Sequence, residues 1–136
     1  MNAPRTPLAR QPLTRWTLVA AAALAVGACA MKTPAAPAMT MDGVFVGANQ
    51  MTLYTFDRDA AGSGKSVCNG PCATNWPPLF AMDGDTASGD YSIVNRDDGK
   101  KQWAFKGKPL YYWAKDMKAG DKTGDGFNNV WHVAKP

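Results

Sequence analysis

Cysteine, histidine and methionine have the most distinctive chemistry among the side chains of this sequence. The chain has one histidine, seven methionines and three cysteines, Cys29, Cys68 and Cys72. Imidazole, thioether and thiolate groups are copper ligands, so His132 with the methionines is a weak candidate copper site. The methionines show no ligand spacing, however, and a single histidine between Trp131 and Val133 is typical of an ordinary strand residue. We therefore expect no metal or other cofactor and keep copper as the alternative.

Cys29 closes a leader with the three-part organisation of a secretory signal. Three arginines precede an alanine-rich apolar segment that falls short of the roughly 20 residues of a transmembrane helix. Residues 24–29 (LAVGAC) resemble a bacterial lipobox, in which small residues precede the lipidated cysteine. Two acyl chains on Cys29 would hold the protein stably on a membrane, since each buried CH₂ contributes roughly 0.8 kcal/mol. We expect residues 1–28 to be a helical lipoprotein signal peptide and Cys29 to be the lipid anchor.

Removal of the leader makes the chain nearly neutral, and this limits the classes of binding partner to be expected. It takes away three of the 15 basic side chains and leaves 12 against 11 acidic ones, all aspartate. A nearly neutral chain without a basic stripe gives no reason to expect nucleic-acid binding. Ala30 occupies the position at which aspartate signals inner-membrane retention. We therefore expect a lipid-anchored envelope protein, in a diderm on the outer membrane, facing the periplasm or the exterior.

Cys68 and Cys72 enclose the tripeptide Asn-Gly-Pro. Outside the cytosol two nearby thiols usually pair, and Cys29 carries lipid, so we expect a Cys68–Cys72 disulfide. The chain-entropy expression gives about 2 kcal/mol for a five-residue loop, so its main role is to fix the turn before Trp76. A redox-active pair is the alternative, although three residues rather than two separate the cysteines.

Other chemistry has little support in the sequence. Aspartates gather at 83–90 and 121–125, but both stretches depart from the EF-hand loop and the chain has no glutamate to close one. With one histidine and no Gly-x-Ser-x-Gly element, a catalytic triad has little to build on. We identify no catalytic constellation and expect a protein that is not an enzyme.

The elements that must position these groups are mainly strands. Residues 29–41 are expected to be the anchor and a flexible Pro/Ala tether, and 42–136 the folded domain. Within it, no window keeps a helical apolar period for three turns. Short runs rich in aromatic and β-branched residues are instead separated by Gly, Asp, Asn or Pro, which predicts a small antiparallel sheet or barrel-like domain. The runs are 44–46, 53–56, 91–94, 102–105, 110–113 and 130–133.

The domain contains an internal repeat. Residues 53–59 align with 110–116 at an offset of 57, and both read Leu-Tyr-x-aromatic-x-basic-Asp. Such duplication predicts two related β units that pack together. On a strand the tyrosine and the aromatic share one face, and the aspartate falls at the turn, where its carboxylate accepts backbone N–H groups. The motif residues are Tyr54, Phe56 and Asp59 in the first copy and Tyr111, Trp113 and Asp116 in the second.

Behind a lipobox, these two motifs resemble the bacterial predicted lipoproteins with a Tyr-x-(Phe/Trp/Tyr)-x-x-Asp motif, also called the secreted-repeat family. Residues 68–73 and the Trp-Pro-Pro segment at 76–78 are similar to the cysteine loop of its first repeat. The likeness places the repeats at about 43–80 and 91–134. It implies a secreted or lipid-anchored repeat domain and leaves the biochemical role open.

Two functional hypotheses follow. The first is a non-enzymatic domain that binds an envelope component or protein partner through exposed aromatics, with Trp76, Tyr112 and Tyr54 as candidate contacts. The second is a periplasmic redox or copper-handling protein that uses His132, methionines and the Cys68/Cys72 pair.

Overall fold

The computed structural model describes residues 4, 7, 9, 12, 27 and 35–136 of the chain. The chain divides into two units, residues 1–33 and 34–136, and the fold described below is that of the second. The expected signal peptide falls in the first unit, and Cys29 itself lies outside the described residues. No helix among the described residues has the length and apolar character needed to cross a membrane.

The second unit is mainly β, as its composition of β-branched and aromatic residues predicts. Helical structure in the described part is limited to α1 (Pro71–Asn75) and the 3₁₀ turn η1 (Phe127–Asn129). The strands are short: β1 (Met39–Met41), β2 (Val44–Val46), β3 (Tyr54–Phe56), β4 (Tyr91–Asn95), β5 (Lys101–Phe105), β6 (Lys108–Pro109) and β7 (Trp131–Val133).

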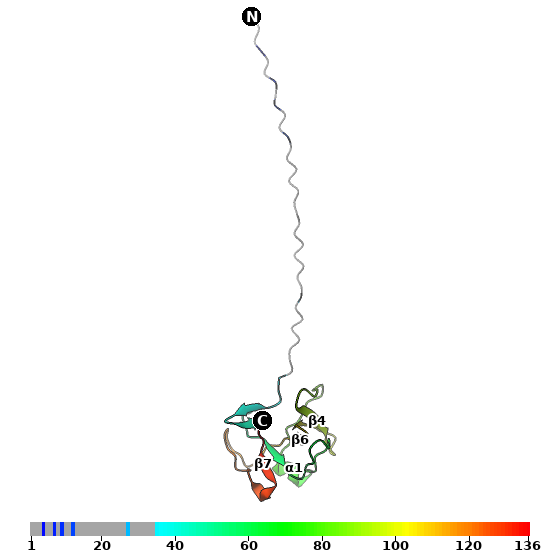
Figure 1. Ribbon diagram of the computed structural model, residues 1–136, viewed down its shortest axis with the longest axis vertical. Helices are drawn as coiled ribbons and strands as arrows, with labels where there is room; N and C mark the ends of the chain where they lie inside the picture. The colour runs from blue at the N-terminus through cyan, green and yellow to red at the C-terminus, as the bar shows by residue number, and fades with distance from the viewer. Residues whose placement is uncertain (1–3, 5–6, 8, 10–11, 13–26, 28–34) are drawn as a thin grey trace. The chain divides into compact units, whose positions relative to one another are not determined.

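These strands form three small antiparallel sheets, with orders β1-β2, β3-β7 and β4-β5-β6. The β3–β7 pair joins the two repeats, because β3 belongs to the first copy and β7 to the second (Figure 1). Its register places Phe56 opposite Trp131 and Tyr54 opposite Val133. The central pairing of the domain is therefore made between the copies rather than within one copy.

Two boundaries differ from the sequence-based expectation. The domain includes β1, which begins at Met39, and the buried Ala38, whereas the sequence predicts a start at 42. Residues 110–113 form no regular strand; Tyr111 makes isolated bridges to Tyr54 and to Pro78 instead.

The turn between β5 and β6 shows why a glycine lies in this hairpin. Lys106 and Gly107 both have positive φ, 47° and 80°, as a type I′ hairpin turn requires. A Cβ at Gly107 would lie 2.4 Å from the backbone nitrogen of Gly62. Any side chain at position 107 would therefore clash with the backbone of the loop that contains Gly62.

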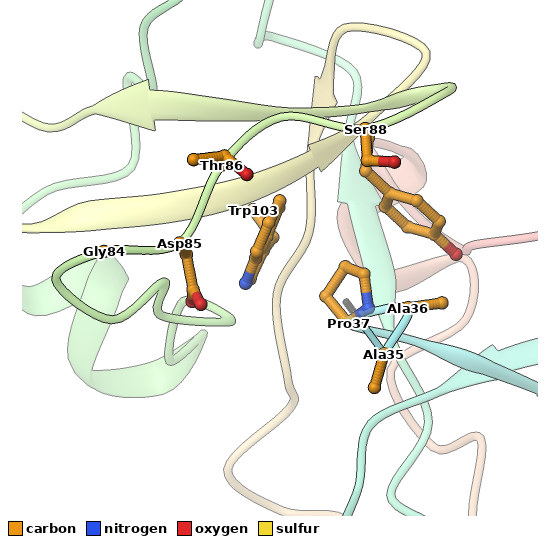
Figure 2. Close-up of a pocket in the computed structure, with 9 residues that line it drawn as sticks. Ala35, Ala36, Pro37, Gly84, Asp85, Thr86, Ser88 and Trp103 are labelled. Atoms are coloured by element: carbon orange, nitrogen blue, oxygen red, sulfur yellow. The ribbon is translucent and has the colours of Figure 1, made fainter. Parts of the chain in front are cut away.

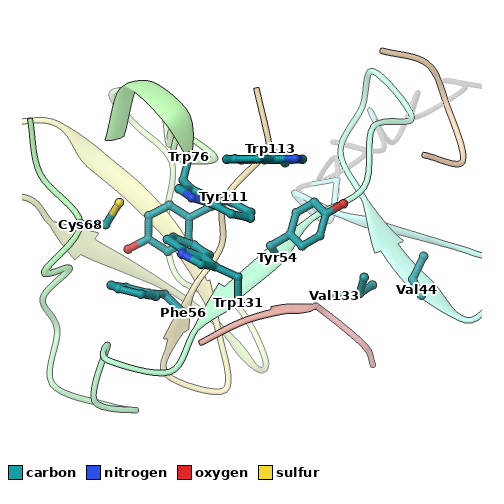
Figure 3. Packing of buried hydrophobic residues seen from close by; sticks show 9 residues of the cluster. All are labelled: Val44, Tyr54, Phe56, Cys68, Trp76, Tyr111, Trp113, Trp131 and Val133. Atoms are coloured by element: carbon teal, nitrogen blue, oxygen red, sulfur yellow. The ribbon is translucent and has the colours of Figure 1, made fainter. Parts of the chain in front are cut away.

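The interior consists of two clusters of buried apolar residues. One surrounds Phe45, Leu53, Trp103 and Leu110. The other contains the aromatic residues of both repeat motifs together with the tryptophans that follow them (Figure 3). The repeat motif thus lies at the centre of the second cluster.

Candidate functional site

The two repeat motifs are joined by hydrogen bonds that cross between the copies. The Tyr54 hydroxyl donates to Asp116 Oδ2 at 2.6 Å. The Tyr111 hydroxyl donates to Asp59 Oδ2 at 2.5 Å. Each tyrosine is therefore bound by the aspartate of the other motif, and neither tyrosine is bound by the aspartate of its own motif.

Backbone hydrogen bonds repeat the same crossing. Tyr54 N donates to Tyr111 O at 2.8 Å, and Tyr111 N donates to Tyr54 O at 3.0 Å. On either side of this pair, Asp57 N donates to Val130 O and Ala114 N donates to Asn75 O, at 2.8 and 2.9 Å. Residues 57 and 114 differ by the same offset as the motifs, so the two copies interlock with approximate twofold symmetry.

Both motif aspartates are buried, with 1% of Asp59 and 7% of Asp116 exposed. The second oxygen of each binds the turn that follows its own motif. Asp59 Oδ1 accepts from Val67 N at 2.7 Å, and Asp116 Oδ1 accepts from Thr123 N at 3.0 Å. Each carboxylate thus holds a local turn and a distant tyrosine together, and the interpretation of the acid as a turn-fixing group agrees with these contacts.

Burial raises the pKa of Tyr54 and Tyr111 well above the usual value for tyrosine, and the bonded carboxylates raise it further. A buried phenolate would lose hydration and lie against an acidic group, which disfavours its formation. Both hydroxyls therefore remain protonated donors at physiological pH.

Four aromatic rings stack in a continuous column through this crossing (Figure 3). Phe56 stacks on Trp131 with ring centroids 4.2 Å apart, Trp131 on Trp76 at 3.8 Å, and Trp76 on Trp113 at 4.0 Å. Stacked aromatic pairs contribute about 0.5–1.5 kcal/mol beyond their buried area. Since every contact in the column joins one repeat to the other, the column stabilises the interlock.

The expectation that Trp76 and Tyr54 are exposed contacts is wrong. Only 3% of Trp76 is exposed, because its ring is packed between Trp113 and Trp131. Tyr54 is fully buried by its edge-on contact with Trp76 and its bond to Asp116. Both residues are part of the core.

Tyr112, the third candidate contact, is half-buried. Its ring lies over Gly47, where an added Cβ would lie 2.0 Å from the Tyr112 hydroxyl oxygen. Burial raises the pKa of Tyr112 as well. Much of its surface therefore packs against the backbone at Gly47 and is not available as a platform.

Cys68 and Cys72 form a disulfide, with an S–S distance of 2.06 Å, which confirms the predicted pairing. Cys68 is fully buried and Cys72 is partly exposed. The bond closes the turn at the start of α1, one turn before Trp76. The disulfide therefore supports the segment that delivers Trp76 to the aromatic column.

Arg96 was not among the residues predicted to be important; it lies just past β4 and is only 4% exposed. Its guanidinium donates to Cys68 O at 2.8 Å, to Gln102 Oε1 at 2.8 Å and to Ser66 Oγ at 3.0 Å. Ser66 Oγ in turn lies 2.6 Å from the Tyr111 hydroxyl. Arg96 thus ties the disulfide turn to the motif tyrosine, and nothing in its local sequence distinguishes it from a solvent-exposed turn residue.

His132 lies on the surface and pairs with Asp57, with His132 Nε2 2.8 Å from Asp57 Oδ2. This pair also joins the two repeats, since Asp57 follows β3 and His132 lies in β7. Across the described part of the chain, no three His, Cys, Asp or Glu side chains come close enough to hold a metal ion.

A cavity of about 170 Å³ lies outside the motif cluster (Figure 2). Tyr91 and Trp103 form its aromatic wall, and the loop that carries Asp85, Thr86 and Ser88 forms a polar wall. The segment that enters the domain, residues 35–37, closes a third side. This cavity could not be predicted from the sequence, because its walls come from separate segments of the chain.

The fold and the crossed motifs define a β domain built from two interlocking repeats. The chain belongs to the family described as a secreted repeat of unknown function, which matches residues 38–80 and 92–135. The match confirms the resemblance seen in the sequence and agrees with an extracellular or envelope location. No curated protein and no solved structure matches the chain.

Proposed function

We propose that this protein is a lipid-anchored, non-enzymatic envelope protein whose two-repeat domain is a rigid scaffold that binds an envelope component. The crossed Tyr–Asp pairs support the scaffold role, and the lipobox at residues 24–29 supports the anchor. Both aspartates and both tyrosines of the motif are buried and bonded to each other, so the motif builds the scaffold. A group buried in this way contacts no substrate.

The position of the domain start supports anchoring close to a membrane. Residues 35–37 line a cavity of the domain, and the lipobox motif predicts lipidation at Cys29. The five residues between them, 30–34, reach roughly 16 Å if extended at about 3.1 Å per residue. The domain then stands immediately beside the bilayer, where a scaffold meets envelope components.

Replacement of the anchor cysteine tests this proposal. We expect the wild-type protein to incorporate labelled lipid and to fractionate with membranes, and Cys29→Ser to do neither. The control is the double variant Cys68→Ser/Cys72→Ser, which also replaces cysteines, removing the disulfide, but keeps Cys29 and should remain lipidated. A Cys29→Ser protein that stays with the membrane, or a wild type without lipid, contradicts the proposal.

A further inference from the structure

We propose that the cavity beside Trp103 binds one pyranose ring of an envelope glycan. This inference rests on the proposed function and names the class of ligand for its scaffold. The cavity is separate from the crossed motif, since its lining shares no residue with the motif cluster.

The size of the cavity suits a single sugar ring. Pockets for drug-sized ligands have volumes of about 300–1,000 Å³. The present cavity measures about 170 Å³ and is partly open to solvent (Figure 2). A monosaccharide unit fits this space, and the open side lets a longer glycan continue outward.

The two walls match the two kinds of surface on a pyranose. The partly exposed Tyr91 and Pro37 offer apolar surface for the C–H face of a sugar, and Trp103, 8% exposed, packs edge to face against Tyr91 at 6.4 Å and adds only its exposed part. Asp85 and Thr86 also line the cavity and offer a carboxylate and a hydroxyl for sugar hydroxyl groups. A ring with one apolar face and a polar edge contacts both walls at once.

The polar loop is held in place before any ligand arrives. Ser88 N donates to Tyr91 O and Tyr91 N donates to Ser88 O, both at 3.0 Å, which closes the loop onto β4. Asp85 Oδ2 accepts from Met82 N at 2.7 Å, which orients the carboxylate. A preorganised loop loses less conformational entropy on binding.

Charge favours a neutral ligand. Asp85 supplies the negative charge among the described residues that line the cavity, and none of those lining residues is lysine or arginine. Phosphate and carboxylate ligands are typically bound by cationic side chains or clustered backbone N–H groups. A neutral sugar has no such requirement.

Titration with N-acetylglucosamine tests the inference. The protein is the mature chain from residue 29 with Cys29→Ser, labelled with ¹⁵N, and the readout is the set of tryptophan indole N–H resonances. We expect the Trp103 resonance to shift saturably with a millimolar Kd, while that of Trp131 in the core stays in place. Trp103→Phe assigns the resonance, and sorbitol, an acyclic polyol, is the matched control ligand.

Two variants probe the polar wall. Asp85→Asn and Thr86→Ala should each weaken binding about fivefold, the effect of losing roughly one hydrogen bond. Asp83→Asn, a neighbouring exposed aspartate outside the cavity lining, should bind as the unmodified chain does. An unchanged Trp131 resonance in each variant shows that the core remains folded.

The inference fails if the Trp103 resonance does not shift at an N-acetylglucosamine concentration of about ten times a millimolar Kd. It also fails if sorbitol shifts this resonance equally, or if neither polar-wall variant weakens binding. Because this experiment uses a chain without lipid, its failure leaves anchoring at Cys29 intact. Conversely, a wild type that carries no lipid contradicts the proposed function without changing the titration.

Discussion

Tyr111 gives its phenolic hydrogen to Asp59, and Ser66 Oγ lies on the other side of the same oxygen. Both Asp59 and Ser66 are buried; Asp59 Oδ2 depends on Tyr111 for its donor, whereas Ser66 Oγ also accepts from Arg96. A buried acceptor left without a donor costs about 1–3 kcal/mol. The individual residues of the motif are therefore coupled, and loss of one hydroxyl affects groups from both repeats.

Replacement of this hydroxyl should be destabilising at neutral pH. We expect Tyr111→Phe to lower the free energy of unfolding by about 1–3 kcal/mol, because Asp59 loses its donor. Tyr112→Phe is the matched control at the next position, where the ring is only half-buried, and should change stability by less than about 0.5 kcal/mol. Urea denaturation followed by tryptophan fluorescence measures both; equal effects would contradict the role assigned to Tyr111.

The raised pKa values of Tyr54 and Tyr111 predict a specific alkaline instability. The folded protein holds these protons more tightly than the unfolded chain, in which tyrosine has a pKa of about 10. The contribution to stability is complete below about pH 10 and is lost as the pH rises above it, by up to about 1.4 kcal/mol per pH unit for each tyrosine.

Urea unfolding measured between pH 8 and pH 11 tests whether the free energy of unfolding falls as the pH rises. The wild type should lose stability steeply above about pH 10, and Tyr54→Phe/Tyr111→Phe, though less stable at pH 8, should show a shallower decline. A double variant with the same steep decline would assign the alkaline transition to other groups.

At the level of elements, the disulfide turn is held by two independent constraints. The Cys68–Cys72 bond closes it, and Arg96 binds its carbonyl oxygen at Cys68 together with Ser66 and Gln102. The short loop limits the disulfide contribution to about 2 kcal/mol. Arg96 makes several buried hydrogen bonds at once, so it should contribute more than the disulfide to the free energy of unfolding.

Arg96→Met should therefore lower the free energy of unfolding by about 3 kcal/mol or more, against about 2 kcal/mol for Cys68→Ser/Cys72→Ser. Arg58→Met, at an exposed arginine of the first motif, is the control and should have little effect. Chemical denaturation gives all three values. A smaller loss for Arg96→Met than for the disulfide variant would contradict this ranking.

Five of the six expected runs coincide with strands, but 110–113 forms none and β1 and β6 lie outside the expected runs; strand partners could not be predicted from the sequence. The run at 130–133 is β-favouring, and β7 forms there. The pairing of β7 with β3 could not be predicted from the local sequence. The alignment of 53–59 with 110–116 shows that the two copies are related, but not whether strands pair within one copy or between the copies. The burial of Trp76 has the same origin, since a crossed arrangement places it between two tryptophans of the other copy.

At the scale of the whole molecule, the crossings make the domain a single folding unit. The β3–β7 sheet, the aromatic column and the backbone pairs around Tyr54 and Tyr111 all join the first repeat to the second. A separated repeat would expose the apolar surface that its partner covers. Repeat units that bury their core only against a neighbour do not fold alone.

We accordingly expect residues 35–91 and 92–136, expressed separately, to lack dispersed amide resonances and to unfold without cooperativity. Mixing the two should restore a folded complex, because every crossed contact can form between chains. Nuclear magnetic resonance spectra of each half and of the mixture provide the measurement. A half that folds alone would show that the interlock is dispensable.

The central claim is that the repeat motif works across the copies, and a double-mutant cycle tests it most directly. For Tyr54→Phe with Asp116→Asn, the crossed pair, we predict a coupling energy of at least about 1 kcal/mol in the free energy of unfolding. For Tyr54→Phe with Asp59→Asn, two residues of the same motif, we predict near-additive effects, within about 0.5 kcal/mol. Coupling within the motif and additivity across the copies would contradict the account.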